Sequence, residues 1–182
     1  MAIRNILTGD EPALKKKSRI VTEFNDRLHQ LLDDMHETLE KANGLGLAAP
    51  QVGVLRRVAL IVEINTDTDP VEEKTIELIN PEIIEYTGTQ EGTEGCLSLP
   101  GVYGIVCRPE QVKVRAHDRF GKTFEITCSG LTARAVCHEI DHLNGVLFTT
   151  LTEHLLTEEE LDELHEKQLK EQEEKNDKEV SI

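Results

Sequence analysis

The apolar residues that follow position 23 repeat with the period of an amphipathic helix. They recur at spacings of three and four residues, which places them on one side of an α-helix. The positions are Phe24, Leu28, Leu31, Leu32, Met35 and Leu39. Thr22 offers an N-cap, and Asn43-Gly44 offers a C-terminal stop. The pattern therefore predicts a helix that begins near Phe24 and ends near Asn43, with one buried face.

Two pairs of segments have the composition of antiparallel strands. The pairs are Arg57–Ile64 with Thr75–Ile84, and Gln111–Ala116 with Thr123–Cys128. The first pair is rich in β-branched and aliphatic residues, and the acidic segment 65–73 between its members is typical of a loop. Asn80-Pro81 interrupts the second segment of that pair. The other pair alternates apolar and polar residues, and Asp118–Gly121 supplies the turn between them.

One segment contains neither glycine nor proline, and residues typical of helix ends lie on both sides of it. Leu131–Leu143 follows Ser129-Gly130 and precedes Asn144-Gly145. We predict a helix of about three turns here. Helices and hairpins interleave along the chain without a βαβ rhythm, which favours an α+β fold over a doubly wound sheet.

The C-terminal segment is predicted as an acidic helix. It begins at Thr157, where Glu160 three residues later completes a capping box. Beyond roughly residue 170 the segment is mostly charged, and we expect a solvated end. Residues 157–179 hold eleven acidic residues and four lysines, a net charge of −7.

Composition and charge narrow the classes of function. The chain has 182 residues, the size of one domain, and a formal net charge of −15, which argues against broad electrostatic binding of nucleic acid. Its longest purely aliphatic run, Val58–Val62, is too short to span a membrane. The N-terminus lacks the features of a secretory signal. We therefore expect a cytoplasmic protein whose four cysteines stay reduced. Such cysteines indicate metal binding or catalysis in preference to disulfide bonds.

His138-Glu139-Ile140-Asp141-His142 lies within the helix predicted over 131–143. Two histidines four residues apart share one helical face, so both imidazoles can reach one metal ion. The glutamate beside the first histidine can approach a water molecule at that ion. The same residues also fit an ordinary charged helix with two surface histidines, although apolar positions surround them.

A hydrolytic metal site needs a third protein ligand and an open position for water. No third His or Glu follows at the spacing of the familiar zinc proteases, so we consider the cysteines. Cys96 stands in Glu94-Gly95-Cys96-Leu97-Ser98-Leu99-Pro100, whose glycine and proline mark a loop. Cys137 is next to His138, and neighbours on a helix diverge by about 100°. Cys96 is thus a candidate ligand, and a buried apolar role for it stays open.

A third segment, Gly44-Leu45-Gly46-Leu47-Ala48-Ala49-Pro50-Gln51-Val52-Gly53, combines small residues with one polar side chain. Small residues permit a close approach of the backbone to a ligand. The segment opens neither a phosphate-binding helix nor a βαβ unit, so we reject a nucleotide loop. A tight connection between helix and strand is the simpler alternative.

Together, in this order, the three segments resemble the signature motifs of the peptide deformylases. The matching pieces are Gly44-Leu-Gly-Leu-Ala-Ala-Pro-Gln51, Glu94-Gly-Cys-Leu-Ser98 and His138-Glu-Ile-Asp-His142. The resemblance implies an α+β fold with the His-Glu-x-x-His helix packed among antiparallel strands. It also implies a hydrolase that removes the N-formyl group from the initiator methionine of new polypeptides. The catalytic domain would span residues 1–156, followed by an acidic helix and tail over 157–182.

The resemblance also assigns roles to residues. The metal ligands would be Cys96, His138 and His142, with water as the fourth ligand. The ion would be Fe²⁺, with Zn²⁺, Ni²⁺ or Co²⁺ as substitutes. Glu139 would transfer protons, while the Gln51 amide and the Leu97 backbone N–H would stabilise the oxyanion. Leu45 and Gly46 would hydrogen-bond the extended substrate. The pocket for the methionine side chain would be lined by Leu45, Leu131 and Ala135.

Three positions depart from the family pattern. Cys137 replaces a glutamine found in many members and adds an oxidisable thiol. Tyr103 lies where some members carry an arginine thought to contact the peptide. Residues 157–179 are acidic where some members have a basic helix that docks on the ribosome. We therefore expect no more than transient contact with the ribosome, and formylated nascent chains in a bacterial cytoplasm as the partners.

Two alternatives remain at this point. A peptidase that cleaves internal bonds could carry the same helix motif, but it would need a third ligand other than Cys96. A non-catalytic protein could use the cysteine and the two histidines as a structural zinc site. Structural sites are usually closed by four protein ligands, and Glu139 and Gln51 would then have no role.

Overall fold

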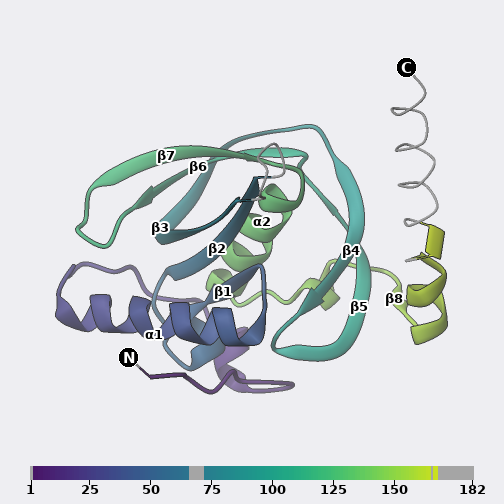
Figure 1. The fold of residues 1–182 in the computed structure, drawn as a ribbon, viewed down its shortest axis with the longest axis horizontal. Helices are drawn as coiled ribbons and strands as arrows, with labels where there is room; N and C mark the ends of the chain where they lie inside the picture. Colours follow the sequence, from purple (N-terminus) through teal and green to yellow (C-terminus); the bar gives the residue numbers. More distant parts are fainter. Residues whose placement is uncertain (1, 66–71, 165, 168–182) are drawn as a thin grey trace.

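The computed structural model of this chain describes residues 2–65, 72–164, 166 and 167. It has a mixed α+β architecture, with two antiparallel sheets packed around helix α2, Gly130–Asn144 (Figure 1). The larger sheet has the strand order β1-β2-β3-β6-β7, and the smaller one has the order β4-β5-β8. The strands are β1 Gly46–Ala48, β2 Val58–Asn65, β3 Glu72–Thr87, β4 Gln90–Cys96, β5 Leu99–Arg108, β6 Gln111–His117, β7 Thr123–Ser129 and β8 Leu155–Leu156. The predicted α+β class is confirmed.

Helix α1 spans Asp26–Ala42 and ends at Asn43, as its sequence predicts. Its N-cap is Asn25 and not Thr22, so that part of the prediction was wrong. The Asn25 side chain accepts hydrogen bonds from the backbone N–H groups of Arg27 and Leu28, at 3.1 and 3.3 Å. Asparagine caps a helix at least as well as threonine, and the later start leaves Phe24 outside the helix.

Strand β2 is buried on both faces. Leu60 belongs to the apolar cluster that packs against α1, and the next residue, Ile61, belongs to the cluster that packs against α2. Since adjacent strand residues face opposite sides of a sheet, this strand lies between the two helices. The two-sided burial explains why Val58–Val62 is a continuous apolar run and not an alternating one.

The two predicted hairpins are present. Strands β2 and β3 pair antiparallel, as do β6 and β7. Asn80 interrupts β3 with φ +52°, and the pairing with β6 shifts its register there. The Asn80 side chain joins this point of the strand to the N-terminal segment, because it accepts from Val21 N at 2.8 Å and donates to Val21 O at 2.9 Å. Residues 66–71, most of the predicted loop, lie outside the described part of the chain.

The segment around Gly95 and Pro100 differs from the prediction. We predicted a loop, whereas Cys96 ends β4, and β5 begins at Leu99. The two strands pair along their length from Gln90↔Arg108 onward. The glycine that suggested a loop, Gly95, is required by packing instead, because a Cβ there would lie 2.7 Å from the Tyr103 ring.

The C-terminal helix begins as predicted. The Thr157 and Glu160 side chains each accept from the other residue's backbone N–H, at 3.2 and 2.9 Å, which confirms the capping box. Residues 158–164 are helical, and the solvated end predicted beyond residue 170 lies outside the described residues. The division of the chain at residue 157 stays a prediction. Within the described part of the chain, no helix has the length and apolar character needed to cross a membrane.

A half-buried carboxylate ties α1 to the larger sheet. Glu77 on β3 contacts the guanidinium of Arg119, from the β6–β7 turn, and the imidazole of His36 on α1, the latter at 3.0 Å. Burial alone would raise the pKa of Glu77, but the hydrogen bonds from His36 and Arg119 outweigh it and lower the pKa to about 2. Glu77 is therefore ionised in the folded protein at any ordinary pH.

This shift predicts a pH-dependent loss of stability in Glu77→Gln. The folded pKa of about 2 lies below the ordinary value of 4.5, so the carboxylate stabilises fully above about pH 5 and loses its effect as the pH falls toward 2. We expect the variant to lose about 1–3 kcal/mol of unfolding free energy at pH 7 and little near pH 3. Urea unfolding followed by circular dichroism measures the difference. Glu73→Gln, on an exposed part of β3, is the matched control, and a loss that stayed constant from pH 7 to pH 3 would refute this account.

Candidate active site

The predicted site residues converge on one cavity of about 580 Å³. Its walls come from the segment around β1, the β4–β5 hairpin and the first half of α2. The predicted residues in the wall are Leu45, Gly46, Gln51, Cys96, Leu97, Leu131, Ala135, His138 and Glu139. The remaining one, His142, lies deeper, with 1% of its surface exposed. Segments about fifty residues apart in the sequence therefore form one site.

Three ligand-type side chains meet at the floor of this cavity. His138 and His142 are one turn apart on α2, with ring centroids 4.9 Å apart. Cys96, at the end of β4, places its Sγ 3.1 Å from His142 Nε2. One ligand atom from each of the three residues lies within 4.8 Å of the others. Cys137 does not belong to this group, and burial raises the pKa of its thiol to about 11.

The donor set fits a divalent transition-metal ion. A thiolate and two imidazoles around one tetrahedral ion lie roughly 3.5 Å apart and leave a fourth position open. Burial lowers the pKa of His142 to about 3, which keeps its ring neutral, as a ligand must be. Burial also opposes charge on His138, but hydrogen bonds to Cys96 and Glu94 outweigh it and raise its pKa to about 10. The surroundings of the His138 ring thus favour a positive charge.

Glu94 holds the first histidine in place, a role that the sequence analysis missed. Its Oε2 lies 3.1 Å from His138 Nδ1, which leaves the Nε2 of that ring for the cluster. Arg108 donates to both carboxylate oxygens, at 2.8 and 2.9 Å, and Arg134 donates at 3.0 Å. Burial would raise the pKa of Glu94, but the hydrogen bonds from Arg108 and His138 lower it to about 2. The alternation of side chains along a strand could have indicated this role, because Glu94 and Cys96 share one face of β4.

Glu139 is a buried carboxyl group at the cavity wall. It is 3% exposed, and its Oε2 has no hydrogen-bond partner among the described residues. Burial raises its pKa to about 7, although the charge of His138 opposes the shift. The carboxyl group packs directly on the backbone of Gly46, where a Cβ would lie 2.5 Å from Oε1. Only glycine fits there without moving Glu139.

Gln51 is fixed with its amide nitrogen toward the cysteine. It lies in the 3₁₀ turn Ala49–Val52, and its Oε1 accepts from Ala48 N at 2.7 Å. Its Nε2 donates to Ser98 Oγ at 3.2 Å and lies 3.7 Å from Cys96 Sγ. Ser98 is fully buried and was not predicted as a site residue. The amide therefore points an N–H group at the ligand cluster.

A helix-borne His-Glu-x-x-His motif, a cysteine and a buried carboxyl group in one cavity define a metal-dependent hydrolase. A sequence model of the family described as polypeptide deformylase matches residues 3–157. The chain belongs to this family, whose members are metalloenzymes that remove the N-formyl group from newly made polypeptides.

Relatives agree in sequence and in fold. A peptide deformylase of Alkaliphilus metalliredigens is 58% identical over 82% of this chain and 96% of its own length. One of Caldicellulosiruptor bescii is 51% identical over 90% of this chain and 93% of its own. The crystal structure of a peptide deformylase from Legionella pneumophila is similar with a TM-score of 0.76 and 42% identity, over 92% of this chain and 98% of that one.

The hydrogen bond between Glu94 and His138 predicts a weaker metal site in Glu94→Gln. Such outer partners orient a ligand and raise its basicity, and their loss typically costs about 10–100-fold in metal affinity. Competition with a chelator, on protein shown to be folded by circular dichroism, measures the affinity. Glu91→Gln on the same strand is the control, because Glu91 is exposed and lies outside the cluster. Equal affinities in the two variants would contradict the assigned role of Glu94.

Proposed function

We propose that this protein hydrolyses the formamide bond of N-formyl-methionine in new polypeptides with Cys96, His138 and His142 as ligands of one divalent ion. The main support is the convergence of their three ligand atoms within 4.8 Å, at the floor of the cavity that Glu139 and Gln51 also line. Three protein ligands leave room for a substrate or water, as in catalytic and not structural sites.

We infer Fe²⁺ as the ion, with Zn²⁺, Ni²⁺ or Co²⁺ as functional substitutes. A set of one thiolate and two imidazoles is acceptable to all of them. A bound ion would supply Lewis-acid chemistry, because it polarises a carbonyl group and makes water more acidic. The protein's own contribution is to fix the ligands, because Glu94 orients His138.

Glu139 is proposed as the group that moves protons. A carboxyl group with a pKa near 7 can accept a proton from the attacking water and deliver it to the leaving amine at neutral pH. Its burial supports this role, since the same burial that raises the pKa also keeps solvent from competing. The backbone of Gly46 fixes where the carboxyl group sits.

Gln51 and Leu97 are proposed to stabilise the oxyanion that develops on the formyl oxygen. The Gln51 amide nitrogen donates to Ser98 Oγ at 3.2 Å and to Cys96 Sγ at 3.7 Å, so one of its N–H groups already points toward the reacting group near Cys96. The Leu97 backbone N–H follows directly after the cysteine in the tight β4–β5 turn. Donors that are fixed before the reaction stabilise charge without reorganisation.

The substrate is proposed to bind as an extended strand. Strand β1 is at the edge of the larger sheet and, within the described residues, pairs with β2 alone. Its other edge can therefore hydrogen-bond a peptide through Leu45 and Gly46. Leu45 and Leu131 are 36% and 54% exposed at the cavity. With Ala135 they would form the apolar pocket for the methionine side chain.

We further infer that the protein works on formylated nascent chains in a bacterial cytoplasm. The relatives described above are bacterial. The acidic segment 157–179 would be repelled by ribosomal RNA, so contact with the ribosome would be transient.

Glu139→Gln tests the reaction and the role of the carboxyl group together. We expect formate release from N-formyl-Met-Ala-Ser to fall by roughly 10²–10⁴-fold with metal content unchanged, because proton transfer is lost while the ligands remain. Glu23→Gln, an exposed carboxylate outside the cavity, should keep full activity. A parent protein with one equivalent of Fe²⁺ and no formate release would overturn the proposed function.

The metal assignment predicts sensitivity to air. Protein purified without oxygen and loaded with Fe²⁺ should lose activity on exposure to air, since both the ion and its thiolate are open to oxidation. The Ni²⁺-loaded protein should keep its activity under the same exposure. Metal analysis and formate release, followed over time, measure the effect. Equal loss in both forms would contradict Fe²⁺ oxidation as the cause.

A further inference from the structure

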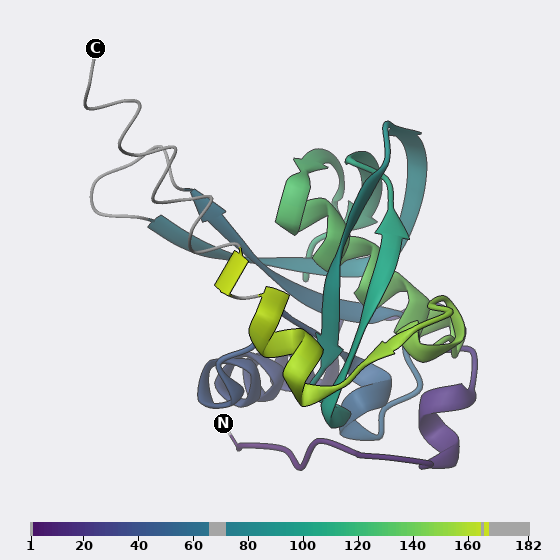
Figure 2. The same cartoon turned by 90° about the vertical axis from the view of Figure 1, so that its right-hand side faces the viewer.

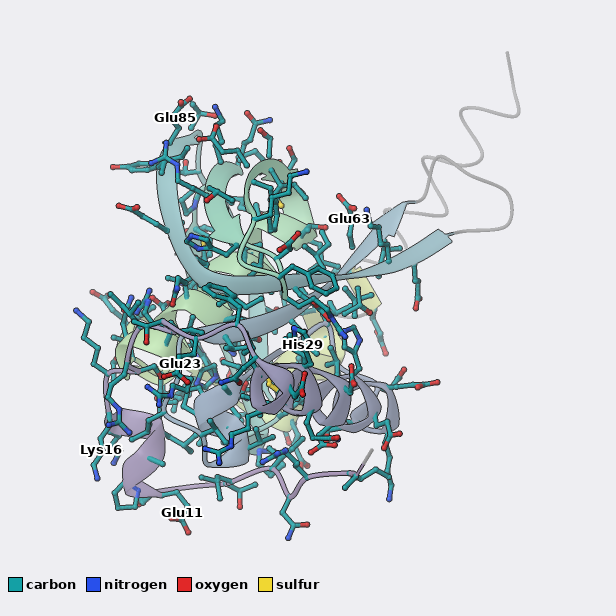
Figure 3. The ribbon with its side chains drawn as sticks, turned by 90° about the vertical axis from the view of Figure 1, so that its left-hand side faces the viewer. Glu11, Lys16, Glu23, His29, Glu63 and Glu85 are labelled. Atoms are coloured by element: carbon teal, nitrogen blue, oxygen red, sulfur yellow. The ribbon has the colours of Figure 1, made fainter. Side chains whose placement is uncertain are left out.

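The N-terminal segment crosses the molecule behind the active site. We call residues 2–10 the N-terminal strap, which leads into the 3₁₀ helix Pro12–Lys15. In Figure 2 the strap runs along the base of the molecule, below α1 and the tip of the β4–β5 hairpin. At its far end, Glu11 and Lys16 flank the 3₁₀ helix and project into solvent (Figure 3). The strap lies wholly within the described residues, and none of its residues lines the active-site cavity.

Two backbone N–H groups of the strap donate to residues of the site. Leu7 N donates to Gln51 O at 2.7 Å, and Gly9 N donates to Ser98 O at 2.9 Å. The two donors are two residues apart, so one short stretch of backbone reaches both acceptors. The strap therefore joins the 3₁₀ turn Ala49–Val52 to the turn between β4 and β5.

Both hydrogen bonds act on Gln51. Leu7 fixes the backbone carbonyl of this residue directly. Gly9 acts through the fully buried Ser98, whose Oγ accepts from Gln51 Nε2 at 3.2 Å. The remaining polar atom of the side chain, Gln51 Oε1, accepts from Ala48 N at 2.7 Å. Gln51 is thus held at three atoms, and the strap supports the bonds at two of them.

The start of the strap is anchored to α1. Ala2 N donates to Asp34 Oδ1 at 2.8 Å, and Arg4 N donates to Thr38 Oγ1 at 2.9 Å. The Arg4 guanidinium also pairs with Asp34, at 2.9 Å. Both acceptor residues are buried positions of the helix. These contacts fix the first residues of the strap to a core helix.

The chain that follows the strap is anchored on the other side of the site. Leu14, in the 3₁₀ helix, is fully buried. Ser18 N then donates to Leu143 O at 2.8 Å, at the end of α2. Because the chain is fixed both before and after it, the strap holds Gln51 in a set position relative to the helix that carries the two histidines.

The position of the Gln51 amide matters for the reaction. A hydrogen-bond donor stabilises a developing charge when it is fixed in place beforehand, and a misplacement of about 1 Å can cost roughly 10²-fold in rate. On the premise of the proposed function, in which Gln51 stabilises the oxyanion, we propose that Leu7 and Gly9 are positioning residues for this donor. They act from outside the cavity, through the backbone of Gln51 and through Ser98.

Leu7→Pro tests the first of the two hydrogen bonds on the metal-loaded full chain. Proline has no N–H, and Leu7 already has the negative φ that proline requires. We expect kcat for N-formyl-Met-Ala-Ser to fall about tenfold, with KM and metal content within about twofold of the parent, because only an interaction of the transition state is weakened. Leu7→Ala is the matched control. It removes the same side chain but keeps the N–H, so its kcat should stay within about threefold of the parent.

Gly9 supplies a second test that does not depend on proline. Its φ is +70°, and a Cβ there would have no described atom within 4 Å beyond its chain neighbours, so Gly9→Ala strains the backbone without a clash. Relief of this strain turns the N–H away from Ser98, and we expect kcat to fall about threefold. Gly9→Asn should restore the parental kcat, because asparagine tolerates this conformation. Gly121→Ala, at φ +82° in the β6–β7 turn and outside the cavity, carries the same strain and should match the parent.

A double-mutant cycle separates this role from a general effect on folding. In a Gln51→Ala background the donor is absent, so Leu7→Pro should change kcat by less than about twofold. A strap that only stabilised the fold would lower kcat by the same factor in both backgrounds. Circular dichroism and metal analysis of all four proteins ensure that folded, metal-loaded enzymes are compared.

Each failure has its own signature. If Leu7→Pro has the kcat of Leu7→Ala, or loses the same factor with and without Gln51, the inference is wrong. If Leu7→Pro does not fold, Gly9→Ala decides, and a kcat equal to that of Gly121→Ala overturns the inference. If Gln51→Ala alone matches the parent, the inference and the donor role of Gln51 both fail, while deformylation stands. A metal-loaded parent that releases no formate overturns the proposed function itself.

Discussion

The active site depends on one buried ionic interaction, that of Glu94. Its carboxylate is 5% exposed and joins three parts of the chain: Arg108 from β5, Arg134 and His138 from α2, and its own strand β4. Arg108 extends the network to Asp141, which directly precedes His142 on α2, with 2.6 Å between the guanidinium nitrogen and the carboxylate oxygen. Removing one partner of a buried ion pair costs about 3–5 kcal/mol, because the other charge is left unpaired. The smaller sheet and the metal helix are thus fixed relative to each other by the same group that orients a ligand.

Small residues make the close packing around this network possible. A Cβ on Gly92 would lie 2.9 Å from the Arg134 guanidinium, and one on Gly46 would meet Glu139 at 2.5 Å. Neither glycine has a positive φ, so backbone strain is not their reason. They are required because charged side chains lie directly on the backbone. In the resulting site, the neighbours of Glu94 and Glu139 set the positions and the pKa values of both carboxyl groups.

The same burial gives two glutamates opposite properties. Glu94 has arginine partners that outweigh desolvation, and it stays ionised. Glu139 lies five residues, about one and a half turns, from Arg134 along α2. It has no arginine partner among the described residues, so desolvation prevails and its pKa rises to about 7. One carboxylate can therefore serve as a fixed negative charge that supports a metal ligand, while the other is able to exchange a proton.

The sequence by itself determined the parts whose signal is local. Periodicity and cap residues predicted four features that are all present. These are the spacing of His138 and His142, the apolar face of α1, the β2–β3 and β6–β7 hairpins, and the capping box at Thr157. The family motifs further indicated Cys96, Gln51 and Glu139 as neighbours.

Tertiary structure decided what depends on contacts between distant segments. Strand β4 was not predicted because its glycines, Gly92 and Gly95, are required by packing under Arg134 and Tyr103. Glu94 received its role from arginines fourteen and forty residues away. Strand β8 pairs with β5 about fifty residues earlier in the chain, and no local pattern encodes that pairing.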